Sequence, residues 1–142
     1  MFDPVFLGSP LPTEDINILP SRTPSNLARL AVALWRLGAQ IRTPDEPVPA
    51  RLDAAFLSQM PHMLNLVTDF GILDLAFAPA GPRKGYEEWS AGASSIEIAE
   101  RLVVRVASLD DIIDSKTAAN RPKDLRALPY LESLRDTITS TD

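Results

Sequence analysis

Apolar residues recur at helical spacing in some segments and form short strand-like runs in others. This alternation along the chain predicts a protein with both helices and strands. Between Thr23 and Gly38 apolar residues recur three or four positions apart, which is typical of a helix that buries one face. Thr23 and Pro24 suit the start of this helix, and Gly38 suits its end. Shorter apolar runs predict strands at residues 15–19, 39–42, 64–68, 72–77, 94–99 and 102–107.

The order of these segments predicts an α/β (α+β) fold, in which a mixed β-sheet is flanked by helices. Between the strands we expect short helices at residues 51–60 and 86–93, and proline-rich loops at residues 43–50 and 78–85. The length predicts a single domain over residues 1–142, with frayed ends at residues 1–6 and 137–142.

The last third of the chain predicts a C-terminal helix hairpin. Ser108 suits the N-cap of its first helix, and Asp110 and Asp111 place negative charge in the first turn, where the helix dipole favours it. Asn120 tolerates the left-handed conformation that closes many helices, and Pro122 suits the first turn of the next helix. These signals place a short turn between two helices.

Charged side chains gather around this turn. Lys116, Arg121, Lys123 and Asp124 lie within nine residues, and such a cluster can hold a phosphate. Two plainer interpretations stay open. In the first, the cluster is a solvated basic corner of the hairpin. In the second, Asp124 forms a structural salt bridge with Lys116 or Arg121.

Composition limits the function classes without selecting one. The 142 residues carry a net charge of −5, which argues against a broad nucleic-acid surface, although a local basic patch can still hold an RNA phosphate. There is no cysteine, which excludes disulfides and thiolate metal sites. No apolar run approaches the ~18 residues of a membrane span, and no signal peptide is indicated. We expect a cytoplasmic protein.

Single aromatic and titratable residues carry weaker signals. His62, the only histidine, suits a surface or packing position better than a general base. Trp35 and Trp89 lie in predicted helices, and both are expected to pack in the core.

Three segments together resemble proteins of the nucleotidyltransferase-fold superfamily. The sequence R-P-K-D at residues 121–124, preceded by Lys116, is similar to the C-terminal signature of that superfamily. The segment G-S-P-L-P-T-E-D-I-N-I-L-P, residues 8–20, resembles its turn and metal-binding strand, and F-G-I-L-D-L-A-F, residues 70–77, resembles the strand with a third carboxylate. The resemblance covers about residues 7–135 and includes aminoglycoside-modifying enzymes and bacterial nucleotidyltransferase-type toxins of toxin–antitoxin pairs.

The resemblance implies a chemistry for these segments. Asp15, Asn17 and Asp74 would hold Mg²⁺ against a nucleoside triphosphate (NTP), because Mg²⁺ prefers hard oxygen ligands. Asp74 would also act as the base for an acceptor hydroxyl on a tRNA, a protein or a small molecule. Nucleotide contacts are expected from Gly8, Ser9, Lys116, Arg121, Lys123 and Asp124. Lys116 would also be catalytic, because with Lys123 it would neutralise charge on the triphosphate as pyrophosphate leaves.

The chain also departs from the pattern of these relatives. Asn17 replaces the second metal-binding aspartate, and Leu11 stands where the relatives carry an arginine. The relatives have a helix, a strand and a glycine turn before this point, which the short segment upstream of Asp15 does not supply. The alternative is therefore an inactive homologue that acts as a binding or regulatory partner of the toxin–antitoxin type. Because such a chain would leave a sheet edge open, we also expect a homodimer.

Overall fold

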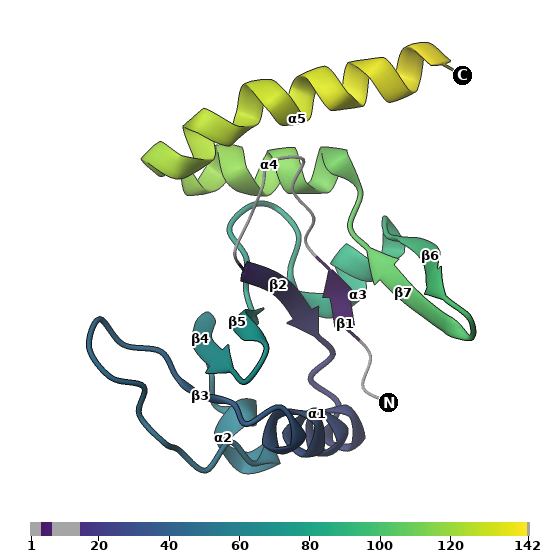
Figure 1. Ribbon diagram of the computed structural model, residues 1–142. Helices are drawn as coiled ribbons and strands as arrows, with labels where there is room; N and C mark the ends of the chain where they lie inside the picture. Colours follow the sequence, from purple (N-terminus) through teal and green to yellow (C-terminus); the bar gives the residue numbers. More distant parts are fainter. Residues whose placement is uncertain (1–3, 7–14, 142) are drawn as a thin grey trace.

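The computed structural model describes residues 4–6 and 15–141, with side chains from residue 15 to residue 138. It is a mixed α+β fold built on one seven-stranded sheet with the strand order β3-β4-β5-β2-β1-β7-β6 (Figure 1). In chain order the elements are β1 (Pro4–Phe6), β2 (Asp15–Pro20), α1 (Pro24–Arg36), β3 (Gln40–Ile41), α2 (Ala54–Ser58), β4 (Met63–Thr68), β5 (Gly71–Ala76), α3 (Gly85–Ala91), β6 (Ser94–Ala99), β7 (Leu102–Val106), α4 (Leu109–Ala119) and α5 (Pro122–Thr141).

The sheet is mixed, as predicted. β2 runs parallel to β5 and β1 runs parallel to β7, whereas the other neighbouring strands are antiparallel. The segment Pro4–Phe6, within the end that the sequence predicts to be frayed, forms β1 between β2 and β7. A run of three residues has too few positions to show a strand period, and its two partner strands are defined only by the tertiary fold.

Each face of the sheet has its own hydrophobic core. Ile18 and the buried leucines of α1 belong to one core, while Leu19 packs with Trp89 and residues of α4 and α5 in the other. Neighbouring residues of a strand point to opposite faces, so β2 contributes to both cores. Figure 1 shows α1 and α2 on one side of the sheet and the α4–α5 hairpin on the other.

Helix α1 follows its sequence signals at both ends, but its tryptophan does not pack in the core. The Thr23 side chain accepts a hydrogen bond from the Asn26 N–H at 3.4 Å, and Gly38 adopts a positive φ of 67° just after the helix. Trp35 is 83% exposed, so its predicted packing role is wrong. Leu30 and Leu34 already fill the buried stripe of this helix. Trp89, in contrast, is buried as predicted.

The C-terminal helix hairpin forms as predicted. The Ser108 side chain accepts a hydrogen bond from the Asp111 N–H, Asn120 takes the left-handed conformation with φ 53°, and α5 begins at Pro122. Helix α5 extends to Thr141, through the segment from residue 137 that the sequence predicts to be frayed. In the described part of the chain, α5 and the shorter helices all lack the apolar length needed to cross a membrane.

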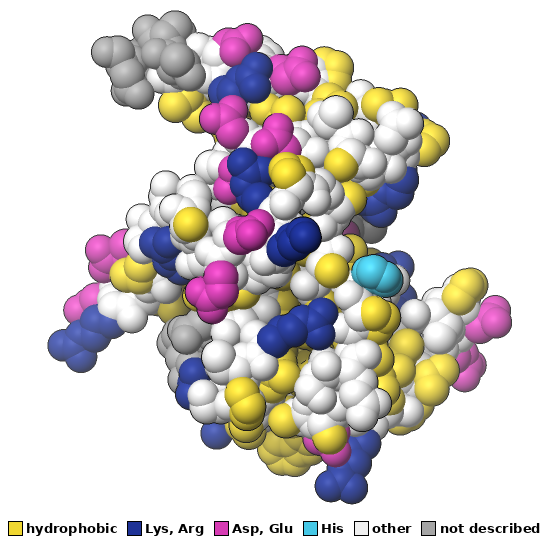
Figure 2. Space-filling model, turned by 180° about the vertical axis from the view of Figure 1, so that it is seen from behind, with side chains coloured by type: hydrophobic (Ala, Val, Ile, Leu, Met, Phe, Trp, Pro, Cys, Tyr) yellow, Lys and Arg dark blue, Asp and Glu magenta, His cyan; other side chains and the backbone are white. Residues whose placement is uncertain are grey.

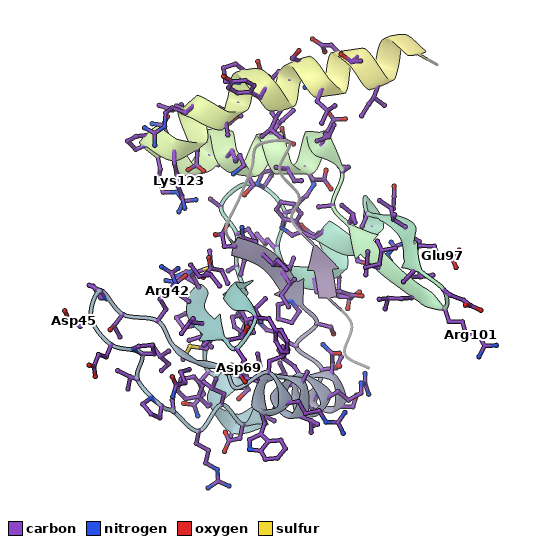
Figure 3. The ribbon with its side chains drawn as sticks, viewed as in Figure 1. Arg42, Asp45, Asp69, Glu97, Arg101 and Lys123 are labelled. Atoms are coloured by element: carbon purple, nitrogen blue, oxygen red, sulfur yellow. The ribbon has the colours of Figure 1, made fainter. Side chains whose placement is uncertain are left out.

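The two edges of the sheet differ. At one edge, Val48 pairs with Ile41 of β3 through two backbone hydrogen bonds of 2.9 Å, so the proline-rich loop partly covers that edge. At the other edge, β6 is exposed along its whole length, and Ile96 and Ile98 are 46% and 61% exposed. Figure 2 shows the β6–β7 hairpin as a projection from the body of the molecule, and Figure 3 places Arg101 at its outer end and Glu97 along the outer side of β6.

The packing of α5 on the sheet can be tested with one leucine. Leu131 is fully buried in the core beneath α4 and α5, so Leu131→Ala should lower the free energy of unfolding by about 2–5 kcal/mol. Leu125→Ala, on the same helix but 50% exposed, is the matched control and should cost about 0.5 kcal/mol or less. Urea unfolding followed by circular dichroism measures both values, and equal losses would contradict this position of α5.

Candidate functional site

The structure brings together the three oxygen-bearing residues that the sequence places on two distant strands. In the parallel pair of β2 and β5, Asn17 lies opposite Asp74, and Asp15 lies two residues earlier on the same strand face as Asn17. Leu19 shares that face and packs in the core beneath α4 and α5. Asp15, Asn17 and Asp74, which we call the sheet triad, therefore lie on the sheet face that is turned toward the α4–α5 hairpin.

Asp74 is the most buried member of the sheet triad. Its side chain is 8% exposed, and it lies within hydrogen-bonding contact of Asp15. Burial raises the pKa of the Asp74 carboxyl above its ordinary value, because a carboxylate loses hydration there; Arg42 lowers this pKa, and Asp15 raises it. Two neighbouring carboxyls in a partly buried place need a proton or a cation beside them.

Arg42 supplies positive charge to this place. Its Nη2 atom donates a hydrogen bond to Oδ1 of Asp74 at 3.1 Å. The backbone N–H of Arg42 donates to the carbonyl oxygen of Asn65, and Asn65 lies opposite Asp74 on β4. Sequence reasoning missed both residues. A signal for Asn65 was present, because Leu64 and Leu66 on either side of it belong to the core of the other sheet face.

The donor chemistry of the sheet triad fits a hard divalent cation. Carboxylate oxygens from Asp15 and Asp74 and the amide oxygen of Asn17 are ligands that Mg²⁺ accepts. Within residues 15–138, however, no three His, Cys, Asp or Glu side chains form a metal-binding group. Asn17 contributes no charge to the triad, so attraction for a cation is weaker than three carboxylates would give.

A second charged cluster forms at the turn between α4 and α5. Asp124 is fully buried, and its Oδ2 accepts a hydrogen bond from Nε of Arg121 at 2.7 Å. Its Oδ1 lies 3.6 Å from Nζ of Lys116. The structure thus shows the salt-bridge interpretation of Asp124, with both predicted cations beside it. Lys116 is paired here with Asp124 and forms no salt bridge with the sheet triad among residues 15–138.

The ion pairs of this cluster change the acidity of Asp124. Burial alone would raise the pKa of the Asp124 carboxyl, but the hydrogen bonds and charges of Arg121 and the charge of Lys116 outweigh it, so the pKa lies below its ordinary value. Asp124 is therefore an anion that orients two cations at the start of α5. That role is structural.

The remaining predicted site residues fall into two groups. Lys123 is exposed, forms no ion pair with any side chain between residues 15 and 138, and projects from the start of α5 on the side of the molecule where Arg42 lies (Figure 3). Gly8, Ser9 and Leu11 lie outside the described residues. His62 is exposed, as the cyan side chain in Figure 2 shows, and its backbone carbonyl accepts a hydrogen bond from the N–H of Phe77, just after β5.

No model of a known protein family matches this sequence, and no curated protein matches it either.

The charge state of Asp124 gives a prediction of pH dependence. Because its folded-state pKa is lowered, its contribution to stability is present above the ordinary value of 3.8 and is lost as the pH falls through the folded-state pKa. At pH 7, Asp124→Asn should lower the free energy of unfolding by about 2 kcal/mol, because a buried charged hydrogen bond is lost. The control is Asp136→Asn, at a side chain that is 75% exposed.

Urea unfolding at pH 7 and at progressively lower pH measures this effect. The difference between the protein and Asp124→Asn should shrink in acid, while Asp136→Asn should follow the unchanged protein throughout. A difference that stays constant with pH would show that Asp124 is not held as an anion.

Proposed function

We propose that this protein is nucleotidyltransferase-like and transfers a nucleoside monophosphate from an NTP to an acceptor hydroxyl. The observation that carries the proposal is the sheet triad, in which Asp15, Asn17 and Asp74 meet on one sheet face. The cations of the α4–α5 turn are on the same side of the sheet. Oxygen ligands opposite a group of lysines and arginines are the arrangement that a metal-bound polyphosphate requires.

Metal binding and phosphate binding would fall to different residues of the described part of the chain. Asp15, Asn17 and Asp74 would hold Mg²⁺, which neutralises charge on the triphosphate when bound. Lys123 is exposed, and Lys116 is only partly covered, with 27% of its side chain exposed, so both amines can reach a phosphate oxygen. Arg121 is held by Asp124 with half of its side chain exposed, which fixes its guanidinium near the same place.

Asp74 is the candidate base. Burial raises the pKa of its carboxyl, which makes its anion a better proton acceptor than an ordinary aspartate. The acceptor hydroxyl would give its proton to Asp74 while its oxygen forms a bond to the α-phosphorus. The bond from that phosphorus to the bridging oxygen breaks, and pyrophosphate leaves. In this proposal the acceptor belongs to a tRNA, a protein or a small molecule in the cytoplasm.

Nucleotide binding tests the proposal directly. Thermal shift and calorimetry with ATP, CTP, GTP and UTP should show Mg²⁺-dependent stabilisation by at least one of them, by about 5 °C at concentrations well above the dissociation constant. Asp15→Ala and Asp74→Ala should abolish the metal-dependent part. Asp45→Asn is the control, because Asp45 is exposed at the outer end of the loop after β3 (Figure 3). No response to any of the four nucleotides would reject the proposal.

A second candidate function is an inactive homologue that acts as a regulatory partner of the toxin–antitoxin type. Two observations favour it: Asn17 brings no charge to the sheet triad, and Arg42 already pairs with Asp74. Such a protein acts through association, and the open edge at β6 is the surface that suits it. Ile96 and Ile98 are both exposed there, and the unpaired edge of a strand accepts another strand.

A homodimer that forms through β6 can be detected as an increase in molecular mass. Multi-angle light scattering over a range of concentrations should show a twofold increase in mass, and Ile98→Lys should shift the midpoint to about tenfold higher concentration. Ile138→Lys is the control, because Ile138 on α5 is similarly exposed at 50% and lies away from this edge. A strictly monomeric protein at every concentration would exclude the dimer.

A further inference from the structure

Arg42 occupies the position where the sheet triad needs a cation. Its guanidinium lies 3.1 Å from Oδ1 of Asp74, whose side chain is 8% exposed. The neighbouring carboxyl of Asp15 adds negative charge. Attraction between opposite charges is strong in such a partly dehydrated place, so one cation is held there and a second is repelled. Arg42 and a divalent metal ion therefore compete for the same carboxylate.

The backbone of Arg42 is fixed, whereas its charged end is accessible to solvent. Ile41 is paired with Leu66 in the sheet, and the N–H of Arg42 donates to the carbonyl oxygen of Asn65 at 3.0 Å. The side chain of Arg42 is nevertheless 40% exposed. A long side chain on a fixed backbone can release Asp74 and turn to a new partner without a change in the fold.

A nucleotide would supply that partner. A guanidinium matches phosphate oxygens as well as it matches a carboxylate, since its donors lie in one plane. Lys123 projects on the same side of the molecule as Arg42, so a triphosphate held by the α4–α5 turn would bring its charge toward both residues (Figure 3). Metal alone offers Arg42 no such partner.

We infer that Arg42 acts as an internal substitute for the divalent cation. It prevents free metal from binding to the sheet triad, and it releases Asp74 when metal and NTP bind together. The inference rests on the proposed function, because it assigns a regulation to that same site. Its consequence is positive coupling: nucleotide strengthens metal binding, and by linkage metal strengthens nucleotide binding by the same factor.

The test measures binding of Mn²⁺ alone by electron paramagnetic resonance and calorimetry at pH 8. Arg42→Gln should bind free Mn²⁺ about tenfold more tightly than the unchanged protein, which corresponds to the loss of one charged hydrogen bond. Arg42→Lys, which keeps the charge, should lie between the two. Arg51→Gln is the matched control, because Arg51 is 91% exposed and pairs with Asp53, which is not part of the sheet triad.

The same proteins are then titrated with each of the four NTPs, with and without Mn²⁺. Coupling between metal and nucleotide should be strong in the unchanged protein and in Arg51→Gln, and should fall about tenfold in Arg42→Gln. Melting curves without ligand verify that every variant is folded. They should also show a lower melting temperature for Arg42→Gln that Mn²⁺ alone restores.

The outcomes separate the inference from the proposed function. Equal affinity for free Mn²⁺ in the unchanged protein and in Arg42→Gln overturns the inference, and metal-dependent NTP binding in both would leave the proposed function intact. Tighter Mn²⁺ binding by Arg42→Gln without any NTP binding would support competition between Arg42 and metal for Asp74, and it would reject the nucleotidyltransferase proposal. Absence of both kinds of binding rejects both.

Discussion

Buried negative charge that must be compensated is the constraint on which the functional side of this protein depends. Asp74 in the sheet and Asp124 at the start of α5 are both covered by other residues, and neither carboxylate would be stable there alone. Each is matched by an arginine, Arg42 in one case and Arg121 in the other. Because the two pairs lie on the same side of the sheet, they define a charged surface between the strands and the C-terminal hairpin.

The two carboxylates differ in how firmly they are neutralised, and this difference separates their roles. Asp124 is held by Arg121 and Lys116, which together keep the pKa of its carboxyl low. Asp74 has a single cation and an acidic neighbour, so burial keeps the pKa of its carboxyl high. A carboxylate of the first kind stabilises a helix turn, whereas one of the second kind still attracts protons and cations. In the proposed function this difference makes Asp74, and not Asp124, the candidate reactive carboxyl.

Features that depend on a few neighbouring residues could be predicted from the sequence, and features that depend on distant partners could not. Ser108 and Asn120 mark the ends of α4 through their own backbone and side-chain preferences, and both predictions are confirmed. The meeting of Asp15, Asn17 and Asp74 followed from strand alternation and from the resemblance. Arg42 was missed, because its partner is 32 residues away and only the sheet register brings them together. Local periodicity also gives no signal for β1, because its partner strands β2 and β7 are far apart in the sequence.

The position of β1 has a consequence for how the chain reaches its native state. Val5 pairs with Leu19 on one side and with Arg105 on the other, so the middle of the sheet joins the first residues to the last third of the chain. Contacts over such sequence separations form slowly, since a long loop must close before they contribute. During synthesis β1 can pair with β2 early, but β7 is made only later, and until then β1 exposes an unpaired edge to which chaperones or other nascent chains can bind.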